Sequence, residues 1–78
     1  MLIRDAAYRR LLKAHRAALH ELVGRHVEAS RAAGDEADIV VAHHFEQVYR
    51  YRSELGALDD QTRALANTAA TRLRSAAE

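Results

Sequence analysis

The chain has 78 residues, a net charge of +1, and neither proline nor cysteine. Apolar residues make up 49% of it, but 17 of them are alanines, which favour helices and bury little surface. We therefore expect a thin core that gains stability from a partner. The lack of cysteine excludes disulfides and thiolate metal sites and fits a cytoplasmic location. No apolar run approaches the roughly 20 residues that span a bilayer, so no membrane contact is expected.

The hydrophobic spacing predicts an all-α fold of about four helices. The first two are expected over about residues 2–12 and 14–30, with a bend near 13–15, where their apolar stripes do not line up. Gly34 is expected to take a positive φ in the cap that closes the second helix. The second helix repeats apolar residues at the spacing of one buried face, which comprises Leu19, Leu22, Val23, His26 and Val27.

The other two helices are predicted over about residues 36–51 and 60–77, with Asp35 and Asp59 as N-caps and Gly56 in the turn. We expect them to form an αα-hairpin. The third helix is apolar over about half its circumference, which indicates cover on two sides. Its apolar residues are Val41, Ala42, Phe45, Val48 and Tyr49. Residues 1–34 then form a helical linker segment and 35–78 the hairpin, as one compact unit or as a fragment of a larger protein.

The histidines do not have the spacing of a metal site within any one helix. His15 and His20 are five residues apart, and His43 and His44 are adjacent, so neither pair matches the i, i+4 spacing of helical zinc ligands. Helix caps explain the paired carboxylates at predicted helix starts. We therefore predict no catalytic, cofactor or metal site. His44 is interpreted as a packing residue that hydrogen-bonds a backbone carbonyl across the hairpin.

Basic residues gather near the N-terminus, where Arg9, Lys13 and Arg16 share one side of the predicted helix. These cations are candidates for contact with phosphate or with a partner. The near-zero net charge argues against a dedicated nucleic-acid surface. A small helical nucleic-acid-binding or transcription-regulatory protein that uses this basic face is therefore the alternative hypothesis.

Two stretches resemble a known family. Residues 2–12, LIRDAAYRRLL, followed by RAALH at 16–20, resemble the segment after the ATPase core of bacterial AAA- or STAND-type signalling ATPases. Those ATPases occur in adenylate or guanylate cyclase-like proteins and in LuxR-type regulators. Residues 41–56, VAHHFEQVYRYRSELG, are similar to the helix that begins the TPR-like region of these proteins. The two stretches keep the order and rough spacing of the family.

The resemblance implies a junction between an ATPase core and a helical sensor region, with the last two helices, over residues 35–78, as a TPR-like αα-hairpin. It implies neither ATPase nor cyclase activity, because the nucleotide-binding loop is missing, and Ala18 and Val48 depart from the family pattern. The matched positions would be packing and junction residues, namely Arg4, Asp5, Tyr8, His20, His44 and Tyr49.

Together these observations predict a non-catalytic helical protein-interaction module. The thin core and wide apolar face lead us to expect a protein partner or a homo-oligomer. The expected packing or interaction residues are Tyr8, Leu19, His44, Phe45 and Tyr49.

Overall fold

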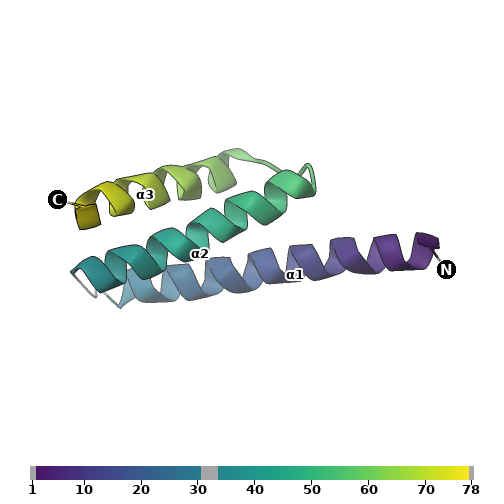
Figure 1. Ribbon diagram of the computed structural model, residues 1–78, viewed down its shortest axis with the longest axis horizontal. Coiled ribbons are helices and arrows are strands. Elements are labelled where there is room, and N and C mark those ends of the chain that lie inside the picture. Colours follow the sequence, from purple (N-terminus) through teal and green to yellow (C-terminus); the bar gives the residue numbers. More distant parts are fainter. Residues whose placement is uncertain (1, 31–33, 78) are drawn as a thin grey trace.

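The computed structural model describes residues 2–30 and 34–77, which form three α-helices (Figure 1). They are α1 (Leu2–Ala29), α2 (Asp35–Glu54) and α3 (Asp60–Ala77). Helix α2 lies between the other two and packs against both. The all-α prediction is confirmed. None of the described helices combines the length and apolarity that crossing a membrane requires.

The prediction of four helices is wrong, because the expected bend near residues 13–15 does not occur. Helix α1 runs through this region without interruption for 28 residues. Residues 13–15 include no glycine or proline to break the backbone pattern. On the continuous helix, Tyr8 and Leu11 of the first stripe lie on the same side as Leu19 and Leu22 of the second, away from α2.

Small residues form the side of α1 that meets α2. Ala17 is 1% exposed, and Gly24 is buried. The Phe45 ring lies so close to Gly24 that a Cβ there would come within 2.8 Å of the ring Cδ1. The absence of a side chain at Gly24 thus sets how closely α1 and α2 pack.

The hydrophobic core centres on α2 and is completed by α3. Phe45 is fully buried there, and the half-buried Val27 packs against the core from α1. The wide apolar face of α2 is therefore covered from two sides, as its sequence indicated. The core comprises Val41, Ala42, Phe45, Val48, Leu65 and Ala69.

The face that sequence spacing predicted to be buried in the second helix is largely exposed. Leu19, Leu22 and Val23 remain open to solvent, and only Val27 packs against the core. The expectation failed because hydrophobic periodicity identifies an apolar side but does not say which neighbour covers it. Small residues allow closer helix packing, and α2 uses the side of α1 that has them.

The turn between α2 and α3 matches its sequence signals. Gly56 has φ 69°, and the Asp59 carboxylate accepts a 2.7 Å hydrogen bond from the Thr62 backbone N–H, as an N-cap does. The predicted start of α2 needs correction. Gly34, with φ 104°, occupies its N-cap position without a side-chain cap, and Asp35 belongs to the first turn.

Two arginines link all three helices through their ion pairs. Arg52 of α2 binds Glu21 of α1 at 2.7 Å and donates to the buried Thr62 hydroxyl of α3 at 3.1 Å. Near the other end of α3, Arg72 binds Asp38 of α2 at 2.8 Å and Glu28 of α1 at 3.6 Å. These partly buried bridges fix the lateral order of the helices.

The contact between Gly24 and Phe45 generates the first prediction. We expect Gly24→Ala to lower the free energy of unfolding by about 1–2 kcal/mol, measured by urea denaturation. Overpacking costs about 1–3 kcal/mol, which outweighs the gain of about 1 kcal/mol in helix propensity. Combining it with Phe45→Leu should relieve the clash, so the double variant should lose less stability than the two single losses added. A stabilised Gly24→Ala protein would contradict the close contact.

Candidate interaction surface

The side of α1 that faces away from α2 carries large apolar side chains, which we call the outer stripe. Its exposed fractions are 60% for Tyr8, 65% for Leu11, 47% for Leu19, 66% for Leu22 and 41% for Val23. Single exposed apolar residues are ordinary, but five on one side of one helix form a patch of the kind that marks interaction sites.

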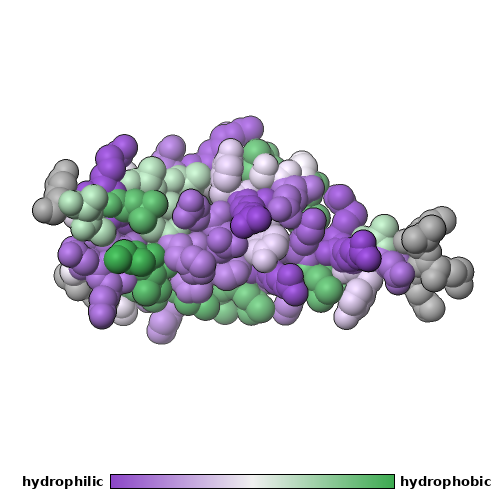
Figure 2. Space-filling model, in the orientation of Figure 1, coloured by the Kyte–Doolittle hydropathy of each residue, from purple (hydrophilic) through white to green (hydrophobic). Residues whose placement is uncertain are grey.

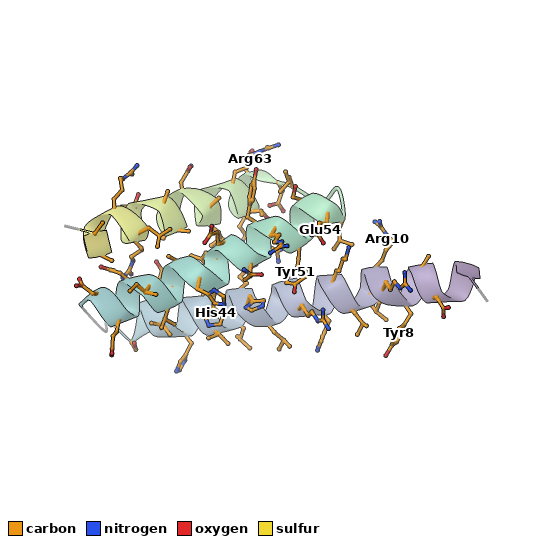
Figure 3. The ribbon with its side chains drawn as sticks, viewed as in Figure 1. Tyr8, Arg10, His44, Tyr51, Glu54 and Arg63 are labelled. Atoms are coloured by element: carbon orange, nitrogen blue, oxygen red, sulfur yellow. The ribbon has the colours of Figure 1, made fainter. Side chains whose placement is uncertain are left out.

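Helix geometry places the outer stripe opposite the packed side of α1. Tyr8 and Ala17 are nine residues apart, which is about two and a half helical turns, so they point in opposite directions. In Figure 3, Tyr8 points away from the other helices, whereas Arg10 points toward the α2–α3 turn. Figure 2 shows hydrophobic side chains along the edge that α1 occupies. Neither α2 nor α3 therefore covers this surface.

The basic residues of α1 divide between its two sides. Arg10 donates a 3.1 Å hydrogen bond to the Leu55 carbonyl, and Lys13 forms a 3.0 Å ion pair with Glu54. Arg9 and Arg16 are exposed, and no described residue forms an ion pair or hydrogen bond with either. Of the three predicted contact cations, Arg9 and Arg16 are available to a partner, whereas Lys13 is paired within the bundle.

The predicted packing residues occupy three different environments. Phe45 is in the core, Tyr8 and Leu19 lie on the outer stripe, and Tyr49 of α2 is 38% exposed. Asp5 is exposed near the start of α1, and the side chain of Arg4 lies outside the described residues. The structure thus brings Tyr8 and Leu19 together on one surface but separates them from Phe45.

His44 forms a contact that the sequence analysis did not predict. Its Nδ1 lies 2.8 Å from Nδ1 of His20 on α1, so its partner is an imidazole and not a carbonyl across the hairpin. One ring must donate an Nδ1–H and the other must accept with a bare Nδ1. The contact therefore requires the two rings to hold complementary tautomers.

Two further rings surround this pair. The His43 ring centroid lies 6.1 Å from that of His20, and the Tyr51 ring stacks on His20 at 6.0 Å. Burial first, and then the proximity of His43, lowers the pKa of His20 below 6.5. Burial, His20 and His43 lower that of His44 in the same way. The folded state thus favours the neutral rings.

These rings do not form a metal centre in the described part of the chain. No group of three or more histidine, cysteine, aspartate or glutamate side chains there is placed to hold one ion. A surface hollow of about 390 Å³ is lined by residues of α2 from Glu46 to Glu54. An enclosed ligand pocket needs walls from several elements, so this hollow has the form of a surface depression.

Glu21 and Glu28 of α1 form ion pairs with arginines of the other two helices. Burial opposes its ionisation, but hydrogen bonds and charge from Arg25 and Arg52 outweigh that effect and lower its pKa below 4.5. Glu28 likewise faces Arg72 of α3. Glu21 therefore stays ionised at neutral pH, and both carboxylates are engaged by arginines of the other helices.

Sequence reasoning missed the pairing of His20 with His44 because it compared histidines only within single helices. The two residues are 24 positions apart and meet through the packing of α1 on α2. If residues 2–29 and 35–54 are written as two antiparallel helices, His20 and His44 fall opposite each other, because each is twelve positions from residue 32. The small residues Ala17 and Gly24 were the signal for which side of α1 to align.

Comparison with known protein families, curated proteins and solved structures finds no match to this chain. The resemblance to signalling ATPases therefore stays a hypothesis based on the two sequence stretches.

The histidine pair generates a prediction of pH dependence. Because folding lowers the pKa of both rings, the unfolded chain binds more protons in acid, and stability falls as the pH drops below about 6.5. We expect the free energy of unfolding, measured by urea denaturation from pH 7.5 to 5.5, to decline over this range. His20→Gln/His44→Gln should flatten the decline.

The matched control is His15→Gln/His26→Gln, which removes two exposed histidines. It should keep the decline of the wild-type protein. If instead the control flattens the profile and the paired variant does not, the His20–His44 contact is not the source of the pH dependence.

Proposed function

We propose that this chain is a non-catalytic helical protein-interaction module that binds its partner through the outer stripe of α1. The observation that carries the proposal is the exposure of large apolar side chains opposite the packed side of that helix. Burying one leucine contributes about 1.5–3 kcal/mol, so Leu11 and Leu22 alone represent substantial unused binding energy.

The rest of the molecule supports a scaffold role for the remaining helices. Helices α2 and α3 bury the core and hold α1 through the ion pairs of Arg52 and Arg72. A helix held on one side presents the other side in a defined orientation, which lowers the ordering cost of binding. The resemblance to the junction segment of signalling ATPases fits the same proposal, since such a segment contacts neighbouring helical regions.

The basic cluster gives the nucleic-acid alternative less support. Arg10 and Lys13 are engaged with the α2–α3 region, so only Arg9 and Arg16 of the described cluster are unpaired. Two exposed arginines beside leucines make a weak phosphate-binding surface but an ordinary border for a protein interface. We therefore propose the protein-binding role.

A labelled amphipathic peptide tests the proposal without knowledge of the natural partner. The probe is a helix of about 21 residues, three heptads, with leucine at the a and d positions and glutamine at the bordering positions. We expect the wild-type protein to bind it in fluorescence anisotropy. Leu11→Gln/Leu22→Gln should weaken binding by about tenfold or more, since tenfold corresponds to about 1.4 kcal/mol.

Two exposed apolar residues elsewhere provide the control. Ile39→Gln/Leu73→Gln removes side chains that are 52% and 43% exposed on α2 and α3. This variant should bind the peptide like the wild-type protein. Equal weakening by both pairs of substitutions, or no binding by the wild-type protein at high micromolar peptide, would contradict a binding surface on α1.

A further inference from the structure

We infer that the partner presents an amphipathic helix whose apolar seam is bordered by carboxylates, and that this helix lies along the outer stripe of α1. The inference rests on the proposed function and specifies the chemistry of the partner. Its evidence is the spacing of the stripe, the distribution of charge around α1 and a hollow beside Leu22.

The spacing of the stripe is that of a helix–helix seam. Tyr8, Leu11, His15, Leu19 and Leu22 follow one another at intervals of three, four, four and three residues, which keeps them on one line along a helix. A lipid-binding helix instead presents a broad apolar face bordered by a strongly charged one. The opposite side of α1 is covered by α2, so the narrow seam fits a partner helix better than a lipid surface.

The charge around α1 is sorted by side. Glu21 and Glu28, the carboxylates of its C-terminal half, are paired with Arg52 and Arg72 of the other helices. Arg9 and Arg16 border the stripe on one edge, and no described carboxylate pairs with them. Asp5, at the start of the helix, is the one acidic residue on the outward side of α1 among the described side chains. The border of the seam is therefore positive along most of its length.

The same charges disfavour a second copy of this chain as the partner. The apolar spacing is symmetric about His15, so the stripe alone would allow two copies to pair antiparallel. In that arrangement like borders face each other, which places Arg16 beside Arg16 of the other copy. Charges that border a helix seam determine which partner binds. Arg9 and Arg16 attract a partner helix with an acidic border and repel a second copy with the same basic border.

A hollow extends the seam on its other edge. It has a volume of about 340 Å³ and includes Ala18 and Leu22 of α1 in its wall. Glu21, Arg25 and Arg52 complete its lining, and both arginines bind Glu21. Two arginines face one carboxylate there, so the rim keeps a net positive charge, and the preference for an acidic border extends to this edge of the seam.

Three peptides that differ only in their borders test the inference. They share the leucine seam of the probe described above and carry glutamate, glutamine or lysine at the bordering positions. In fluorescence anisotropy at low salt, we expect the glutamate peptide to bind at least about fivefold more tightly than the glutamine peptide and the lysine peptide to bind most weakly. Raising the salt concentration should shrink these differences, because salt screens exposed charges.

Substitution of the bordering arginines provides the decisive variant. Arg9→Gln/Arg16→Gln should abolish the preference for the glutamate peptide while it retains binding of the glutamine peptide. The control Arg63→Gln/Arg74→Gln changes two exposed arginines of α3 and should keep the preference. Circular dichroism should show the same helix content for both variants as for the wild-type protein.

The outcomes separate this inference from the proposed function. If all three peptides bind equally and binding still requires Leu11 and Leu22, the interaction surface stands and the acidic partner is wrong. If none binds, both fail. A stable dimer at low micromolar concentration that Leu11→Gln/Leu22→Gln dissociates would overturn the inference in favour of a second copy. Partition into vesicles of phosphatidylserine and phosphatidylcholine without peptide binding would overturn it in favour of a membrane surface.

Discussion

The close approach of Phe45 to Gly24 is the constraint on which the packing of α1 depends. The ring occupies the space that any side chain at Gly24 would need, so this contact fixes both the separation and the rotation of α1 relative to α2. Once the helix is rotated to bring Gly24 and Ala17 inward, the side that carries Tyr8, Leu11 and Leu22 has to face outward. The exposure of the outer stripe is thus a consequence of how the core packs.

Helix α1 differs from most amphipathic helices in which of its residues face the core. In most surface helices the largest apolar side chains cover the core, and polar ones face solvent. Helix α1 buries small residues and leaves leucines and a tyrosine exposed, so these larger side chains add no buried apolar surface to the core. Two features make the observed rotation favourable: the closeness that Gly24 permits, and the engagement of Glu21 and Glu28 by Arg52 and Arg72. A surface left unused by the fold in this way is suited to a partner.

Sequence reasoning succeeded where the signal was local and failed where it depended on the register between helices. The αα-hairpin turn could be predicted because Gly56 and Asp59 act within a few residues of themselves. The His20–His44 contact and the outward direction of Leu19 could not, because each depends on which side of α1 meets α2. Periodicity located the apolar side of α1 but could not tell a face packed in the core from one left for a partner.

The polar contacts explain why the outer stripe has a positive border. Carboxylates placed inside the bundle are needed to neutralise Arg52 and Arg72, which join the three helices, so they are not available on the outward side. Arg9 and Arg16 form no ion pair within the described chain, and exposed arginines contribute little to stability when unpaired. At the edge of an apolar seam, however, they attract carboxylates and repel other basic borders. The separation of paired charges inward from unpaired charges outward therefore gives α1 one side that holds the bundle together and another that, in the proposed function, selects a partner.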